Sequence, residues 1–106
     1  MRVEVVTEGG ETPPVGAPLV VQVLDTTYAD APARVVAEAT ANVEHDRAGE
    51  AQTVELEADL GGNADYRVRA HVDVDGDGAV GPGDFVTTAA HPARAGEPVR
   101  VVVKKV

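Results

Sequence analysis

Apolar and polar residues alternate along most of this chain, and that period of two constrains its fold more than any other feature. The clearest example is the segment 65–74. Its apolar positions are Tyr66, Val68, Ala70 and Val72. Successive side chains of a β-strand point to opposite faces of a sheet, so this alternation predicts a strand with one face in the core.

The same alternation predicts further strands at 2–8, 19–24, 34–44, 52–57, 85–90 and 98–106. The residues expected to face inward in them are Val3, Val5, Leu19, Val21, Val23, Val35, Ala37, Ala39, Ala41, Val43, Val54, Leu56, Val99, Val101 and Val103. Segment 34–44 is also rich in alanine, so a short helix is the alternative there, although the period of two favours a strand. Short alternating strands separated by frequent turns are typical of a β-sandwich. We therefore expect an all-β protein, a single antiparallel β-sandwich of about seven strands over residues 1–106.

Composition excludes several classes of site. The chain has no cysteine, which excludes disulfides, thiolate metal ligands, a cysteine nucleophile and a lipid-modified cysteine within it. It has no serine either, which excludes a Ser/His/Asp triad. Tyr28, Tyr66 and Phe85 are the only aromatic residues, so the core is expected to consist mainly of valine, which favours strands.

The charge excludes some partners. A formal net charge of -9 disfavours nucleic acids and anionic membrane surfaces, both of which attract basic proteins. No apolar run is long enough to span a membrane, and no signal-peptide pattern precedes the first predicted strand. Lys104 and Lys105 in the last predicted strand are expected to protect an exposed sheet edge.

The segment Asp73-Val74-Asp75-Gly76-Asp77-Gly78-Ala79-Val80-Gly81-Pro82-Gly83-Asp84 has the spacing of an EF-hand calcium loop. Calcium takes six to eight oxygen ligands, and acidic residues at loop positions 1, 3, 5 and 12 can supply them. The expected ligands are the side chains of Asp73, Asp75, Asp77 and Asp84 and the backbone carbonyl of Ala79, with Gly81 where a bound water is usual. Because strands flank this loop, and Gly81-Pro82-Gly83 prevents a helix, we expect it on a β-hairpin.

Two features of the loop leave alternatives open. Its last position is Asp84, where the usual loop has a bidentate glutamate; a dockerin loop also closes with aspartate and has a small apolar residue where this chain has Val80. Asp-Gly is itself a strong turn signal, so a hairpin tip without an ion is the alternative to a calcium site. Four acidic side chains in register favour calcium, because crowded carboxylates repel one another.

The histidines offer little evidence for an enzyme. His45, His71 and His91 match no zinc or general-base spacing, and each is expected to be a solvated surface residue. His71 precedes Asp73 by two residues, so it is expected near the acidic loop. An enzyme that activates a metal-bound water would need a cluster of histidines around a cleft, with His71 as the residue to test, and this is the weakest of the functional hypotheses.

Residues in both halves of the chain resemble the YbaY/YscW-type lipoprotein family. In the first half they are Val21-Gln22-Val23-Leu24-Asp25, Ala29-Asp30-Ala31-Pro32 and Val35-Val36-Ala37-Glu38. In the second half they are Tyr66-Arg67-Val68-Arg69-Ala70, the threonine-rich segment 85–88 and Pro92. The resemblance implies a small β-sandwich, usually tethered in the bacterial envelope, and some members are described as chaperones that help assemble secretion machinery. It implies no catalytic residues.

Two functions follow from these observations. The first is a non-enzymatic calcium-binding module in which the ion stabilises the 73–84 hairpin. The alternative is an envelope protein-interaction or chaperone-like domain in which calcium is only structural or absent. This chain lacks the lipidated cysteine of the family, and its acidic loop replaces a shorter hairpin tip, so calcium binding would be a local addition.

Overall fold

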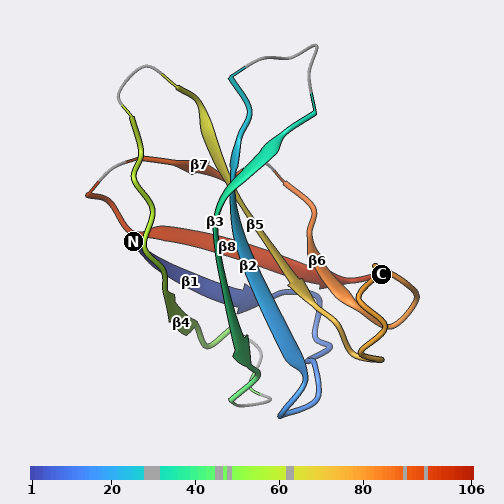
Figure 1. The fold of residues 1–106 in the computed structure, drawn as a ribbon. Coiled ribbons are helices and arrows are strands. Elements are labelled where there is room, and N and C mark those ends of the chain that lie inside the picture. Colours follow the sequence, from blue (N-terminus) through green and yellow to red (C-terminus); the bar gives the residue numbers. More distant parts are fainter. Residues whose placement is uncertain (28–31, 45–46, 48, 62–63, 90, 95) are drawn as a thin grey trace.

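The computed structural model describes residues 1–27, 32–44, 47, 49–61, 64–89, 91–94 and 96–106, and in these residues it contains strands and no helix. The strands are β1 Arg2–Thr7, β2 Pro18–Asp25, β3 Arg34–Asn42, β4 Gln52–Glu55, β5 Tyr66–Val72, β6 Phe85–Thr87, β7 Pro92–Ala93 and β8 Val99–Lys105 (Figure 1). The predicted all-β class is confirmed. Each predicted segment coincides largely with one of these strands, and the short β7 is additional.

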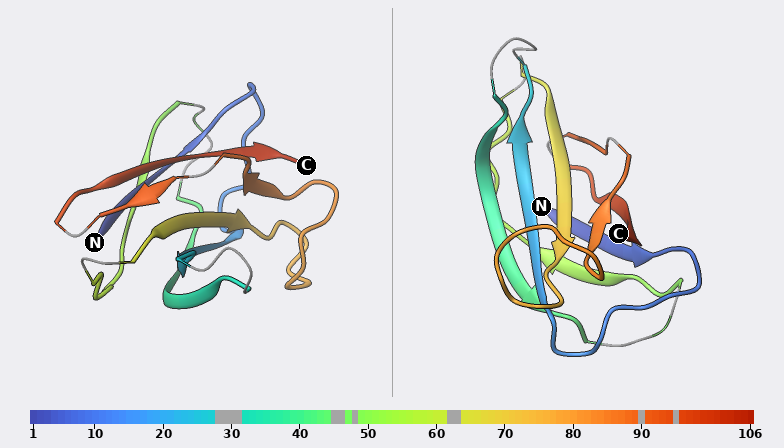
Figure 2. Two further views of the ribbon diagram at one scale, coloured as in Figure 1. Left: turned by 90° about the horizontal axis from the view of Figure 1, so that it is seen from above. Right: turned by 90° about the vertical axis from the view of Figure 1, so that its right-hand side faces the viewer.

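The strands form one continuous sheet in the order β3-β2-β5-β6-β8-β1-β4, with β7 paired to β5. This sheet folds over so that β3, β2 and β5 form one layer while β8 and β1 form the other (Figure 2). One pairing departs from the antiparallel expectation, because β1 and β8 run parallel. These two strands come from opposite ends of the chain, so no short turn joins them and the pair is free to be parallel.

The core lies between the two layers and is built mainly from valine. All of the predicted inward residues of β1, β2, β5 and β8 except Tyr66 are buried. They are Val3, Val5, Leu19, Val21, Val23, Val68, Ala70, Val72, Val99, Val101 and Val103. Burial of a valine or leucine side chain stabilises a fold by roughly 1.5–3 kcal/mol. The alternation of apolar and polar residues therefore accounts for which face of each of these strands forms the core.

Segment 34–44 forms the strand β3, not a helix, but one of its predicted inward residues is wrong. Val35 is 46% exposed. Val23 pairs with Ala37 whereas Leu24 pairs with Val35, so Val36 is an extra residue in a β-bulge. The bulge reverses the alternation at this point, and Val36 packs against the core in place of Val35.

The expectation that Lys104 and Lys105 protect a sheet edge is also wrong. Their strand β8 lies inside the sheet, between β6 and β1, and the ends of the strand order are β3 and β4. The two lysines form surface ion pairs instead. Lys104 Nζ lies 3.7 Å from Glu8 Oε1, and Lys105 Nζ lies 3.5 Å from Glu11 Oε2.

A buried glutamine joins the two strands at the ends of the sheet. Gln52 begins β4, and its side-chain amide donates a 2.8 Å hydrogen bond to the carbonyl of Asn42 at the end of β3. Its side-chain oxygen accepts a 3.0 Å hydrogen bond from the Glu44 N–H. The side chain of Gln52 thus substitutes for backbone pairing where the sheet would otherwise remain open.

Candidate metal centre

The acidic segment 73–84 connects β5 to β6, as predicted for a hairpin loop. Below the loop, His71 pairs with Val86 and Val72 pairs with Phe85. Both ends of the loop also form backbone hydrogen bonds with segments outside the hairpin. The Asp73 N–H donates to the Pro18 carbonyl at 2.9 Å, and the Asp84 carbonyl accepts from the Val106 N–H at 2.8 Å. These contacts fix the two acidic residues that begin and end the loop.

Asp73 is buried, and its two carboxylate oxygens have different surroundings. Oδ2 accepts a 2.7 Å hydrogen bond from the Gly78 N–H. This bond is the main cause that lowers the pKa of Asp73. Oδ1 is buried, with no hydrogen-bond partner among the described residues. A buried oxygen without a partner is costly, so a cation beside Oδ1 would remove a penalty that the loop otherwise carries.

The four predicted carboxylate ligands lie together. Asp73, Asp75, Asp77 and Asp84 each have an oxygen within 4.8 Å of the others. Asp75 shows the effect of this crowding, because the adjacent Asp73 carboxylate, followed by burial and by Asp77, raises its pKa. A raised carboxyl pKa means that the negative charge is disfavoured at this position. The cluster therefore has both the oxygen chemistry and the excess negative charge that a calcium ion requires.

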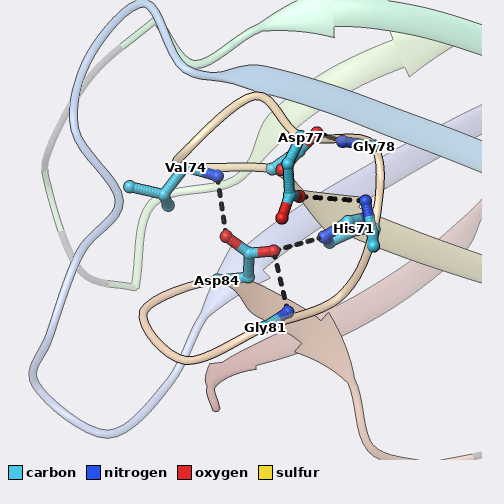
Figure 3. Close-up of polar contacts among 8 residues, drawn as sticks. His71, Val74, Asp77, Gly78, Gly81 and Asp84 are labelled. Atoms are coloured by element: carbon cyan, nitrogen blue, oxygen red, sulfur yellow. Dashed lines mark hydrogen bonds and ion pairs between the residues drawn. The ribbon is translucent and has the colours of Figure 1, made fainter.

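Asp84 is the most buried of these acidic residues and is held by three donors (Figure 3). Its Oδ2 lies 2.9 Å from His71 Nε2 and 3.2 Å from the Gly81 N, while its Oδ1 lies 2.9 Å from the Val74 N. The contact with His71 is the largest cause that lowers the pKa of Asp84. Asp84 thus stands in the predicted cluster as an ionised and firmly oriented carboxylate.

The two predicted backbone positions lie in the same loop. The Ala79 N–H donates to Asp77 Oδ1 at 3.0 Å, which turns the chain just after the third aspartate. Gly81 donates its N–H to Asp84 and accepts a 3.0 Å bond from the Asp84 N–H. Ligation by the Ala79 carbonyl and a water beside Gly81 remain predictions.

His71 lies beside the acidic loop, as expected, but the expectation that it is a solvated surface residue is wrong. Its side chain is only 12% exposed and contacts Asp84. His71, Asp73 and Asp84 also form a second group whose ligand atoms lie within 4.8 Å of one another. The spacing of His71 and Asp73 on one strand face was the available signal, because residues two apart point the same way.

Among the described residues, His91 belongs to neither of these groups. His91 is half-buried rather than solvated, and its Nε2 accepts a 3.5 Å hydrogen bond from the Val102 N–H. Burial lowers the pKa of His91, which favours the neutral ring. His45 lies outside the described residues, as do Tyr28 and the family-like corner at 29–31.

Comparison with known proteins assigns the fold and the family. The model of the type III secretion system lipoprotein chaperone family, YscW, matches residues 3–103. The chain belongs to this family. Comparison with curated protein sequences gives no match.

Among solved structures, the chain is similar to an alternative pilotin from the type II secretion system of Vibrio cholerae. The two have 22% sequence identity and a TM-score of 0.76, over 100% of this chain and 95% of the pilotin chain. At this identity the likeness concerns the fold alone. In the described part of the chain, no helix is long and apolar enough to cross a membrane.

Proposed function

We propose that this protein is a non-enzymatic, protein-binding module of the bacterial envelope that assists a secretion-machinery client, and that its 73–84 hairpin carries a stabilising calcium ion. The observation that supports the first part is the family match across residues 3–103, because the family is one of secretion lipoprotein chaperones. The client is a protein, and calcium has a structural role in this proposal.

The surface offers places where such a client could bind. A hollow of about 410 Å³ lies at the start of β5 and is lined in part by Leu60, Tyr66, Arg67 and Arg94. This hollow is at the opposite end of β5 from the acidic loop. Pockets for small molecules usually measure roughly 300–1,000 Å³, so this hollow could take a side chain or short segment of a client rather than a whole protein surface. A client bound here would leave the acidic loop free to hold its ion.

Client binding is tested with purified secretion-system components from the source organism, titrated against this protein by calorimetry. The titrations are run once with calcium and once with a chelator. We expect one component to bind in both conditions, because the proposed ion stabilises the module and does not form the interface. The proposal would be contradicted if none of the components bound, either with calcium or with the chelator.

Calcium binding is supported most strongly by Asp73 Oδ1. A simple Asp/Gly-rich turn has no reason to bury a carboxylate oxygen that lacks a hydrogen-bond partner. In this loop Asp73 Oδ1 is such an oxygen, and three further carboxylates lie beside it. Asp73 Oδ2 accepts the hydrogen bond from the Gly78 N–H that shapes the loop. Oδ1 has no such bond, and in this proposal it binds the cation. Oxygen donors of this kind are preferred by calcium.

The calcium assignment is tested by calorimetric titration of the chelated protein with calcium and with magnesium. We expect calcium to bind and magnesium to bind much more weakly, because magnesium is smaller and gives up its water reluctantly. Equal affinities, or no heat with calcium, would count against the assignment.

The enzyme hypothesis receives less support from the geometry. The hollow beside His71 is lined by Val20, Gln22, Arg69, His71 and Gly78 and measures about 140 Å³. Substrate pockets are usually larger, at roughly 300 Å³ or more. His71 Nε2 is also engaged by Asp84 Oδ2, so this nitrogen is not available to activate a water molecule.

A further inference from the structure

We infer that His71 is a positioning residue of the calcium site: its hydrogen bond to Asp84 Oδ2 directs Asp84 to bind the ion through Oδ1 alone. This inference rests on the calcium site proposed above. It adds a residue outside the acidic loop to the site, and it assigns the coordination mode of the last ligand.

The contact with Asp84 determines which proton His71 carries. An ionised carboxylate can only accept hydrogen bonds, so the His71 Nε2 that lies 2.9 Å from Oδ2 must bear the hydrogen. An Nε2 that bears hydrogen has no lone pair to offer a metal, so Nδ1 is the one ring nitrogen left that could act as a ligand. Calcium prefers oxygen to imidazole nitrogen, which disfavours ligation by Nδ1. His71 therefore acts on the ion through Asp84 and not as a ligand.

The hydrogen bonds of Asp84 determine which oxygen remains for the ion. Each carboxylate oxygen has about two acceptor sites. Those of Oδ2 are used by His71 and the Gly81 N–H, whereas Oδ1 accepts only from the Val74 N–H. One acceptor site of Oδ1 is left, so Asp84 is a monodentate ligand. This explains how aspartate can serve at a loop position where the usual longer glutamate binds through both oxygens.

The surroundings make this arrangement rigid. The side chains of His71 and Asp84 are 12% and 1% exposed, so little water competes for their hydrogen bond. His71 is paired with Val86 in the hairpin, two residues beyond Asp84 in the chain. The backbone of the hairpin thus fixes both partners. Residues that orient a metal ligand typically change metal affinity by roughly 10- to 100-fold when they are replaced.

The test uses terbium(III), which occupies calcium sites and whose luminescence lifetimes in H₂O and D₂O count the water molecules on the ion. In His71→Ala we expect calcium to bind roughly 10- to 100-fold more weakly and the terbium ion to gain a water molecule as Asp84 loses its orientation. His71→Gln retains a donor near Oδ2 and should restore the wild-type water count. His91→Ala is the matched control, a half-buried histidine at a distance from the loop.

A double-mutant cycle separates positioning from direct ligation. If His71 acts through Asp84, adding His71→Ala to Asp84→Ala changes neither the affinity nor the water count further. Additive losses would show that His71 is itself a ligand, and an unchanged water count in His71→Ala would show that it only supports the fold; either result overturns the inference. Circular dichroism confirms that each variant is folded, and Asp84→Asn replaces Asp84→Ala if the alanine variant is not. Failure of the wild-type protein to bind calcium or terbium would refute the calcium site itself.

Discussion

The carboxylate of Asp73 accepts a 2.7 Å hydrogen bond from the backbone N–H of Gly78, and this contact closes the first half of the acidic loop. Gly78 has a φ of 79°, a conformation that side chains with a β-carbon rarely adopt. The turn at Gly78 therefore orients the Asp73 carboxylate, and the hydrogen bond from Gly78 to that carboxylate stabilises the turn. If the loop is a calcium site, its first ligand is oriented before the ion arrives.

The first prediction concerns that glycine. Gly78→Ala should destabilise the protein by about 1–2 kcal/mol, because alanine must adopt a left-handed backbone conformation. An added β-carbon would meet no atom within 4 Å, so crowding makes no contribution. Gly81→Ala is the control, since that glycine has open space and no positive φ. Urea unfolding measures the free energy of unfolding of both variants. Equal values for the two variants would argue against the positive φ of Gly78 as the cause of the destabilisation.

The second prediction concerns Asp75, whose pKa is raised by neighbouring carboxylates. Asp75→Ala should abolish the stabilisation by calcium, because it removes a proposed ligand. The same change should leave the chelated protein at least as stable as the wild type, because it also removes a repelling charge. Thermal melts with chelator and with calcium measure the two effects. A variant that is stabilised by calcium as much as the wild type would remove Asp75 from the site.

The third prediction concerns the glutamine that joins the end strands. Gln52→Ala should cost about 1–3 kcal/mol, because the Asn42 carbonyl and the Glu44 N–H lose their partner in a partly buried place. Gln22→Ala is the comparison, since the side chain of Gln22 bonds to Glu38 at the surface. Surface substitutions usually change stability by less than about 0.5 kcal/mol. Denaturant titration should therefore separate the two variants clearly.

The fourth prediction concerns acid. Asp25 Oδ1 accepts hydrogen bonds from both the N–H and the hydroxyl of Thr27, the main causes that lower the pKa of Asp25. A carboxyl with a lowered folded pKa adds stability above its ordinary pKa of about 3.9 and loses it as the pH falls through the folded value. Thr27→Val removes the hydroxyl and should lower the free energy of unfolding at neutral pH. Urea unfolding at a series of pH values should show that the difference in free energy of unfolding between this variant and the wild type shrinks below about pH 4. A difference that is independent of pH would contradict this role of the hydroxyl.

The sequence predicted the strands well because most of them have one buried face, as in Val68, Ala70 and Val72. It failed at Val35, because a bulge inserts one residue without changing the polarity pattern around it. It also failed to predict the parallel pairing of β1 with β8, which joins distant segments by packing and not by a turn. Local alternation contains no information about either feature.

The candidate site was predictable in part, because its four acidic residues lie close together in the sequence. The spacing of Asp73, Asp75, Asp77 and Asp84 is local, and the structure brings these four side chains together. The contact between His71 and Asp84 depends on the register of the hairpin, which places Val86 opposite His71. The sequence alone could not give that register. Ligation of an ion by these residues, and by Ala79 and Gly81, remains a prediction.

The most direct test of this account is a thermal melt of the chelated protein, repeated after addition of calcium and, separately, of magnesium. We expect a rise in melting temperature that is selective for calcium. At free calcium about 100-fold above the dissociation constant, the added stability should be about 2.7 kcal/mol. The absence of any shift with calcium would contradict the calcium site and leave the 73–84 loop as an acidic hairpin on a secretion-chaperone fold.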